Sequence, residues 1–485
     1  MTVPAHLTFL DAFFHPKSVA IFGASTNPNK SGYKIVENLL NHQYPGKIFP
    51  INPRGGSILG MSLYKSVLDV AEPVDLAIIF VPNLHVVKII EQCIQKGVRG
   101  AIIEAAGFGE VGLEGKQLRE KLRKVTENFT KIHIIGPNCT GITALDEDGV
   151  GFFSSFIPMA NTKAGSLAIV SQSGFINGAY YPDFTGRNPQ MGLRYVVAIG
   201  NKLDVNENHL LEYFLYDDNV STIGIYIESF YDVRQFILLT RQAHQLQKDV
   251  ILLRSGFSPL GAKATGSHTG ALAENSALIE AVIRQSGCIL ADDFWELFLI
   301  SRTLTFMKDT GTNNLVLPNI GIITISGAAG AIMTDWSAKM GLSVPDLDEN
   351  SYSRLKELYP PWMNPNPFAL VDYWPAVEHM KSYEKVILSS TDILLSCPDI
   401  QVVFLTVYYS ASSWIVDWAK LKDTVEKHKK PIFVWLFGDY QEILQGESIF
   451  QSIELPVFYS EKSLVQTFSK IFTSYSFRDR LKDFK

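Results

Sequence analysis

The chain has 485 residues, of which 46% are hydrophobic and 19% charged, with a formal net charge of -6. This composition is typical of globular proteins, and a prior of about 150 residues per domain predicts about three domains. Because lysine and arginine form no long run, electrostatics give no support to a nucleic-acid or anionic-membrane partner.

Cysteine spacing argues against a disulfide framework. Cys93, Cys139, Cys288 and Cys397 lie far apart and form no CxxC pair. We therefore expect a reduced, cytoplasmic protein without a thiolate metal site. The first residues lack the basic and apolar regions of a signal peptide, and the apolar runs are too short to span a membrane.

The first predicted domain, residues 1–145, alternates short apolar runs with amphipathic helical patterns. We expect strands at Ser18–Phe22, Ile48–Ile51, Leu76–Val81, Ala101–Glu104 and Ile132–Ile135, and helices at Ser31–His42, Val86–Lys96 and Gly115–Asn128. Such alternation is typical of βαβ units and predicts a parallel sheet with helices on both faces. Ligands of such sheets bind beyond the carboxyl ends of the strands.

Two further α/β domains are predicted, at 146–309 and 315–485, joined by the polar segment 310–314. In the second domain we expect strands at Ser166–Val170, Tyr195–Ile199, Ile223–Glu228, Val250–Arg254 and Cys288–Leu290, and helices at Phe175–Phe184, Glu207–Tyr216, Val233–Gln247, Ala273–Gln285 and Phe294–Lys308. In the third we expect strands at Ile320–Ile325, Val402–Val407, Ile432–Leu436 and Val457–Tyr459, and helices at Gly330–Met340, Val377–Ser389, Ser413–His428 and Glu461–Thr473.

A glycine-containing loop, Gly23 to Gly32, follows the first strand. A glycine at that point lets the backbone approach a phosphate, which would face backbone N–H groups and the N-terminus of the next helix. Lys30 adds a positive charge. The G-x-G-x-x-G spacing of dinucleotide sites is absent, which disfavours an NAD-dependent oxidoreductase. An ordinary strand–helix turn remains the alternative for Gly23.

Read in order, the chain resembles the α part of ADP-forming acyl-CoA synthetases, which are relatives of the succinyl-CoA synthetase α subunit. The resemblance rests on SVAIFGAS (18–25), FPINPR (49–54), PVDLAIIFVP (73–82), KGVRGAIIEAAGF (96–108), IGPNCTGI (135–142), IVSQSG (169–174), GNKLDVN (200–206), YIES (226–229), LRSGFSPLGAKATGSHTGALA (253–273) and ISGAAGAIMTD (325–335). It implies a Rossmann-like CoA-binding domain followed by two flavodoxin-like, doubly wound α/β domains.

The resemblance also implies a coenzyme A site in the first domain. Its expected residues are Gly23, Ala24, Ser25, Lys30, Gly32, Asn52, Pro53, Arg54, Val81, Pro82 and Asn138. An arginine near a ribose phosphate is chemically sensible, because its guanidinium can bind phosphate in two places. For Cys139 we prefer burial near bound CoA to a reactive thiol, since no base lies nearby in the sequence.

The resemblance further implies that His268 is phosphorylated. A neutral imidazole is nucleophilic near pH 7, and a partner can fix its tautomer. His268 lies among Gly261, Gly266 and Gly270, which suggest a mobile loop; an idle histidine is the alternative. Glu228, at the end of a predicted strand, is the expected imidazole partner.

The turn Ser171-Gln172-Ser173-Gly174 is expected to hold the phosphoryl group through its N–H groups and hydroxyls, helped by the dipole of the following helix. An ordinary helix N-cap would explain Ser173 equally well.

The implied reaction converts acyl-CoA, ADP and phosphate to carboxylic acid, CoA and ATP. No G-x-x-x-x-G-K-[ST] loop occurs, so we expect a separate ATP-grasp β subunit that binds ATP or ADP with Mg²⁺, in a hetero-oligomer. Phe175 and Glu274 stand where the family usually has alanine and glycine. They motivate a second hypothesis, a CoA-binding sensor or scaffold that has lost catalysis.

Overall fold

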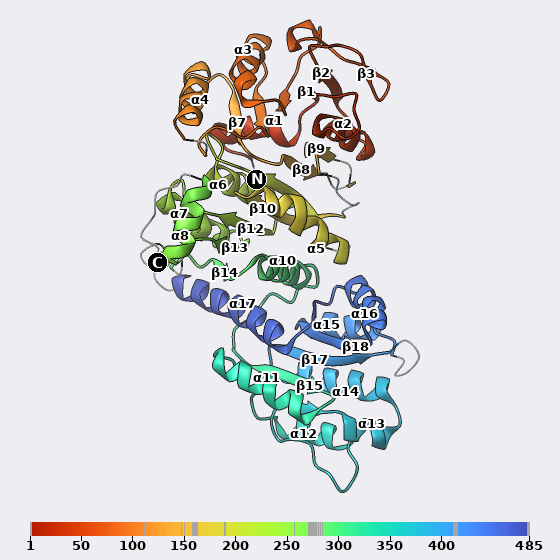
Figure 1. Cartoon of the computed structure of the whole chain (residues 1–485). Helices are drawn as coiled ribbons and strands as arrows, with labels where there is room; N and C mark the ends of the chain where they lie inside the picture. Colours follow the sequence, from red (N-terminus) through yellow and green to blue (C-terminus); the bar gives the residue numbers. More distant parts are fainter. Residues whose placement is uncertain are drawn as a thin grey trace. The chain divides into compact units, whose positions relative to one another are not determined.

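The computed structural model describes residues 2–110, 112–146, 148–149, 151–157, 163–188, 191–256, 258–269, 279, 281, 283, 285–410 and 416–482. The chain forms two compact units, Met1–Leu297 and Phe298–Lys485 (Figure 1). Within the described ranges, no helix combines the length and the apolar character needed to cross a bilayer.

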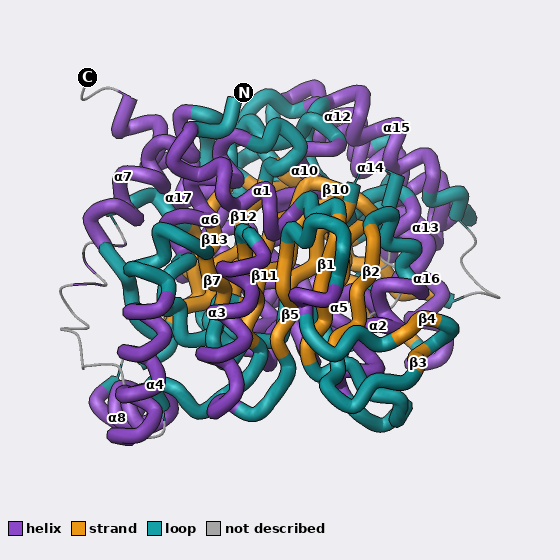
Figure 2. Tube along the Cα trace, turned by 90° about the horizontal axis from the view of Figure 1, so that it is seen from above, coloured by secondary structure: helices purple, strands orange, loops and turns teal. Residues whose placement is uncertain are grey.

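A five-stranded parallel sheet, in the order β2-β1-β5-β6-β7, forms the N-terminal part of the first unit. Its strands are β1 (Ser18–Phe22), β2 (Lys47–Ile51), β5 (Leu76–Ile79), β6 (Gly100–Ile103) and β7 (His133–Ile135), and its helices include α2 (Ser31–Asn41), α3 (Val86–Lys96) and α4 (Gly112–Val125). Figure 2 shows β1, β2 and β5 in orange with α2 and α3 beside them. The strands and helices predicted for this domain are confirmed, with ends that differ by a few residues.

Alternate residues of β1 enter two different hydrophobic clusters. Val19 and Ile21 belong to the cluster that contains the apolar side chains of α2, whereas Ala20 and Phe22 belong to the cluster that contains those of α3. Successive side chains of a strand point to opposite faces, so an entirely apolar strand is buried on both sides. This pattern explains why helices cover both faces of the sheet.

The second sheet of this unit has seven strands in the order β14-β13-β12-β10-β11-β8-β9. The strands are β8 (Ile142–Leu145), β9 (Gly151–Phe153), β10 (Ala164–Ser171), β11 (Leu193–Ala198), β12 (Thr222–Ile227), β13 (Asp249–Arg254) and β14 (Ile289–Ala291). The helices are α5 (Tyr181–Arg187), α6 (Glu207–Tyr216), α7 (Val233–Gln245) and α8 (Pro259–Thr269), and α10 (Phe294–Asp309) leads from this unit into the second. The sequence did not predict β8 and β9, which run antiparallel at the edge beyond β11. The predicted domain boundary at 145 therefore falls at the end of β8, inside this sheet.

The predicted loop around His268 is wrong, because Pro259–Thr269 forms helix α8. Ser258 starts this helix: its Oγ accepts a hydrogen bond from the N–H of Gly261 at 3.0 Å. A serine cap followed by proline in the first helical position is a strong start signal that outweighs the glycines. Most of the predicted helix Ala273–Gln285 lies outside the described residues.

The predicted helix Phe175–Phe184 lies within a continuous helical run, 174–187. Inside this run, Ile176–Tyr180 forms a single π-helical turn, and α5 follows from Tyr181 to Arg187. Such π turns are rare and often lie at functional sites.

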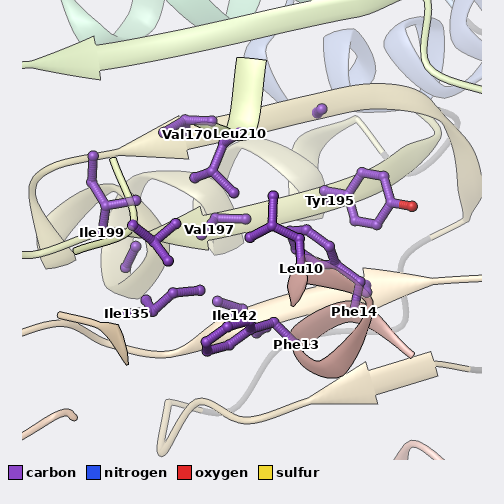
Figure 3. Close-up of a cluster of buried hydrophobic side chains, with 14 of the residues drawn as sticks. Leu10, Phe13, Phe14, Ile135, Ile142, Val170, Tyr195, Val197, Ile199 and Leu210 are labelled. Atoms are coloured by element: carbon purple, nitrogen blue, oxygen red, sulfur yellow. The ribbon is translucent and has the colours of Figure 1, made fainter. Parts of the chain in front are cut away.

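One hydrophobic cluster joins the two sheets of the first unit (Figure 3). The short helices η1 (Ala5–Leu10) and α1 (Asp11–Phe14) contribute Leu10, Phe13 and Phe14 to it. The ring of Phe14 lies 4.7 Å from that of Tyr195 on β11 and 5.1 Å from that of Tyr213 on α6, between centroids. The N-terminal helices therefore pack the first sheet against the second.

The second unit contains a five-stranded parallel sheet in the order β16-β15-β17-β18-β19. Its elements are β15 (Ile320–Thr324), α11 (Gly327–Lys339), α12 (Glu349–Lys356), β16 (Leu370–Asp372), α13 (Trp374–Met380), α14 (Tyr383–Ser396), β17 (Val402–Tyr409), α15 (Ala419–His428), β18 (Ile432–Gly438), α16 (Tyr440–Ser452), β19 (Val457–Phe458) and α17 (Glu461–Lys482). In Figure 1, α11 and α17 lie side by side along this sheet. The doubly wound α/β fold class is thereby confirmed.

The predicted helix Val377–Ser389 is wrong, because two helices occupy that range. Lys381, with φ of +53°, ends α13 in the left-handed conformation. Ser382 then caps α14 by accepting a hydrogen bond from the N–H of Lys385 at 3.2 Å. Serine is a common N-cap, so Ser382 was a sequence signal for the start of a new helix. The regular apolar spacing across this range concealed that signal, and the left-handed Lys381 ends the preceding helix. The elements α12, β16 and α16 were not predicted.

Asp392 on α14 gathers three cationic side chains in the second unit. It accepts hydrogen bonds from Arg354 at 2.9 Å, Lys427 at 2.7 Å and His428 at 2.8 Å. Burial alone would raise the pKa of Asp392, but the hydrogen bonds from Lys427, His428 and Arg354 outweigh burial and lower this pKa to about 2. The carboxylate thus ties α14 to α12 and α15.

We expect the substitution Phe14→Ala to lower the free energy of unfolding of the first unit by about 3–5 kcal/mol, because it empties a buried aromatic site. Urea denaturation followed by intrinsic fluorescence measures this change. Leu84→Ala is the control, since Leu84 is 75% exposed, and should stay within about 0.5 kcal/mol. A loss below about 1 kcal/mol for Phe14→Ala would show that the cluster does not hold the two sheets together.

We expect Asp392→Asn to destabilise the second unit at pH 7 by about 1–2 kcal/mol, allowing for solvent screening. Because the folded pKa lies below the unfolded value of about 3.9, this stabilisation is complete above that value and disappears as the pH falls toward about 2. Thermal unfolding at pH 7 and pH 3 measures the difference. The exposed Asp423 on α15 provides the control, Asp423→Asn. A deficit of equal size at both pH values would contradict the assigned role.

Candidate functional site

The turn after β1 leaves no room for side chains at its two glycines. Gly23 has φ of +91°, and a Cβ there would lie 2.2 Å from the carbonyl oxygen of Phe80. A Cβ on Gly32, in the first turn of α2, would lie 2.0 Å from the carbonyl oxygen of Gly23. The backbone of the loop is therefore packed between the start of α2 and the end of β5, at the edge of the sheet where ligands bind.

Asn52, after β2, ties the next loop to this turn. Its Nδ2 donates to the carbonyl of Ala24 at 2.7 Å, and its Oδ1 accepts from the N–H of Arg54 at 3.0 Å. Among the other predicted CoA residues, Ser25 and Val81 are half-buried, whereas Lys30, Pro53, Arg54 and Pro82 are exposed. Two exposed cations near a tight glycine turn fit a phosphate-bearing ligand such as CoA.

Asn138 lies apart from this turn. Its N–H donates to the carbonyl of Ala105 at 3.0 Å, beyond the ends of β6 and β7. A Cβ on Gly200, before α6, would lie 2.6 Å from the carbonyl oxygen of Asn138. The structure thus places Asn138 where the first sheet meets the second.

Glu104 and Cys139 share a buried position at that junction. Their exposed fractions are 5% and 4%, and the Sγ of Cys139 donates to the carbonyl of Ile103 at 3.4 Å. Burial, and to a lesser degree the neighbouring Glu104, raises the pKa of the Cys139 thiol. The thiol therefore stays protonated, in agreement with the preference for a buried, unreactive cysteine.

Thr140 connects the loop that contains Cys139 to the turn after β10 of the second sheet. Its Oγ1 donates to the carbonyl of Gly174 at 3.4 Å. A Cβ on Gly174 would lie 2.6 Å from the Cγ2 of Thr140, so the glycine permits the close approach. The loop that contains Cys139 and the predicted phosphate-binding turn are therefore in direct contact.

Internal hydrogen bonds hold the Ser171–Gly174 turn in shape. The hydroxyl of Ser171 accepts from the N–H of Ser173 at 3.1 Å and donates to its carbonyl at 2.6 Å. The hydroxyl of Ser173 accepts from the N–H of Phe175 at 3.2 Å. Phe175 is 57% exposed, and its ring meets that of Tyr180 edge to face, with centroids 5.2 Å apart.

Gln172 joins this turn to Glu228. Its Oε1 accepts from the N–H of Glu228 at 2.9 Å, and its own N–H donates to the carbonyl of Tyr226 at 2.9 Å. Glu228 is 8% exposed, directly after β12. Burial, together with the nearby Glu228, raises the pKa of Tyr226, whose hydroxyl donates to Ser255 at 3.2 Å. Glu228 and the 171–174 turn therefore lie side by side.

A buried ion pair, to which the sequence analysis gave no role, holds the segment after Glu228. The Nζ of Lys202 lies 2.9 Å from the Oε2 of Glu207, and their side chains are 8% and 0% exposed. Lys202 also donates to the carbonyl of Ser229, while Glu207 accepts from the N–H of Tyr231 at 2.5 Å. The motif GNKLDVN contains Lys202, and Glu207 follows the motif directly.

The backbone of His268 lies in the last turn of α8, which follows β13, the neighbour of β12. The side chain of His268 is outside the described part of the chain, as is Glu274. The roles predicted for His268, Glu228 and the 171–174 turn stay predictions.

Two family descriptions match the first unit, and the second of them extends a few residues beyond its end. Residues 17–144 match the CoA binding domain, and residues 164–304 match the succinyl-CoA ligase like flavodoxin domain. The first match contains the Gly23 turn, Asn52 and Glu104. The second contains the Ser171–Gly174 turn, Glu228 and α8.

Similar proteins support these matches. The chain is 38% identical over 358 residues to the acetate–CoA ligase (ADP-forming) of Methanocaldococcus jannaschii. The matched region covers 74% of this chain and 48% of that protein. It is 34% identical to the α subunit of acetate–CoA ligase (ADP-forming) I of Pyrococcus furiosus, over 88% of this chain and 90% of the relative. The chain thus spans about half of one relative and most of the other.

Among solved structures, the acetyl-coenzyme A synthetase 1 of Candidatus Korarchaeum cryptofilum, in complex with phosphate and ADP, superposes with a TM-score of 0.84. The two chains are 26% identical, and the match covers 98% of each. With the motifs and the two domain matches, these similarities show that the chain belongs to the ADP-forming acyl-CoA synthetase family.

Proposed function

We propose that this chain is the CoA-binding, phosphohistidine-carrying part of an ADP-forming acyl-CoA synthetase. The contact between Thr140 and Gly174 carries this proposal, because it joins the CoA-binding domain to the predicted phosphate-binding turn. A thioester held beside Cys139 would then meet phosphate held at that turn. Short carboxylic acids are the proposed substrates, and acetate, which the relatives' names contain, is the first to test.

The first step transfers the acyl group from CoA to phosphate and gives an acyl phosphate. The Ser171–Gly174 turn precedes a helical segment, whose backbone N–H groups and dipole favour an anion. The hydroxyls of Ser171 and Ser173 hold the turn in shape through their internal bonds. Holding both reactants in one fixed geometry removes most of the entropic cost of their encounter.

The second step moves the phosphoryl group to His268. Glu228 would accept the imidazole N–H and stabilise the positive charge that develops on the ring. Gln172 and the Lys202–Glu207 pair position the backbone on both sides of this carboxylate. A buried carboxylate that is held in place needs no reorganisation when the charge develops.

The final step, from phosphohistidine to ADP, requires a nucleotide site. We propose that an ATP-grasp subunit supplies this site together with Mg²⁺, which neutralises phosphate charge during transfer. The relative from Pyrococcus furiosus is named as an α subunit, which supports a two-subunit arrangement.

We expect ³²P-labelled acetyl phosphate to label the wild-type chain and the variant His268→Asn to take up no label. Asparagine is polar and cannot form a phosphoramidate under these conditions, so the loss follows from the missing nucleophile. The acid-labile, base-stable label is measured after gel filtration. The exposed His379 on α13 offers the control His379→Asn, which should label like the wild type.

Equal labelling of His268→Asn and wild type would contradict the assignment of His268. Tight CoA binding without any phosphoenzyme in the wild type would instead favour the sensor or scaffold hypothesis.

A further inference from the structure

Glu104 is a buried carboxyl group for which the proposed reaction has so far no use. It follows β6, is 5% exposed, and neither of its oxygens has a hydrogen-bond partner among the residues that the structure describes. A buried carboxyl without partners costs several kcal/mol unless it stays neutral or meets a ligand. Such a residue is retained where a bound molecule uses it.

The surroundings of Glu104 place it at the junction of the two sheets. Its N–H donates to the carbonyl of Ile79 at 3.1 Å, so its backbone is fixed at the carboxyl ends of β5 and β6. Cys139 is close enough for Glu104 to raise the pKa of its thiol. Through Thr140, the same loop contacts Gly174 of the predicted phosphate-binding turn.

Burial raises the pKa of Glu104 well above its ordinary value, which favours the neutral, protonated form of the carboxyl group. A neutral carboxylic acid in a dry site is a strong hydrogen-bond donor and can release its proton to a developing anion. Cys139 is a poorer proton donor, because burial makes its thiol hold the proton more tightly than an ordinary cysteine does.

The proposed function provides such an anion. When an acyl group leaves CoA, the sulfur departs as a thiolate unless it receives a proton. Resting on that function, we propose that Glu104 is the acid–base group for the CoA sulfur. The proton that Glu104 holds between the two sheets then serves the thioester step and no other step of the reaction.

The step balances without an oxidant or reductant. A phosphate oxygen attacks the acyl carbon, a C–O bond forms, and the C–S bond breaks with its electron pair going to sulfur. The proton of Glu104 moves to the sulfur and gives the CoA thiol. The proton that the monohydrogen phosphate carried then returns to Glu104. In the opposite direction, Glu104 first gives its proton to the acyl phosphate, and the resulting carboxylate takes the thiol proton as sulfur attacks the acyl carbon and the C–O bond to phosphate breaks.

The substitution Glu104→Gln tests this proposal, because glutamine keeps the size and polarity but cannot transfer the proton. Two half-reactions of the full chain are compared. Phosphate-dependent release of CoA from acetyl-CoA, followed with a thiol reagent, reports the thioester step; the protein's four cysteines are buried. Labelling by ³²P-acetyl phosphate reports the histidine step, in which no sulfur takes part.

We expect Glu104→Gln to slow CoA release by about 10²–10⁴-fold, the usual contribution of general acid–base catalysis. Labelling by acetyl phosphate should stay within about twofold of wild type, because that step does not use the Glu104 proton. The exposed Glu91 on α3 gives the matched control Glu91→Gln, with both rates unchanged.

An unchanged rate of CoA release in Glu104→Gln would overturn the proposal. Equal loss of both half-reactions would also overturn it, because Glu104 would then only support the fold. If the wild-type chain showed neither half-reaction, the proposed function itself would fail, which separates the two ideas.

Discussion

The packing of Thr140 against Gly174 is the contact on which the proposed chemistry depends, because it joins the loop after β7 to the turn after β10. The predicted CoA-binding loop follows β1 of the first sheet, and the predicted phosphate-binding turn follows β10 of the second. The absence of a side chain at Gly174 allows the approach, since a Cβ there would lie 2.6 Å from Thr140. The aromatic cluster around Phe14 and Tyr195 stabilises the same arrangement.

Hydrogen bonds around this contact show how charged groups are held in a mostly apolar interior. Glu228 depends on its neighbours for its position: Gln172 binds its backbone N–H, and Lys202 binds the next carbonyl. Glu207 neutralises Lys202, so the cation is not buried alone. For Glu104, in contrast, burial raises the pKa of the carboxyl group and so favours its neutral form. The acidic groups thus lie in different environments, as the roles proposed for them in proton and phosphoryl transfer require.

Much of this fold could be predicted from the sequence, because apolar strands flanked by amphipathic helices specify parallel sheets. The strand Ser18–Phe22 and the helix Val86–Lys96 were predicted to the residue. Other predictions failed because two serine N-caps were not recognised. Ser258 starts a helix through residues that were predicted as a loop, and Ser382 starts the second of two helices where one was predicted. Family motifs singled out Glu228 and the 171–174 turn, which the structure brings side by side, while their roles stay predictions. Glu104 was not predicted, because only the folded chain shows that its carboxyl group is buried and has no hydrogen-bond partner within the described ranges.

A crystal structure of the chain with CoA and phosphate tests the central claim most directly. The account predicts that the CoA sulfur lies within about 4–5 Å of the Glu104 carboxyl group and beside Thr140, with phosphate at the Gly174 end of the turn. Binding of the pantetheine arm away from β6, with its sulfur far from Gly174, would contradict the account.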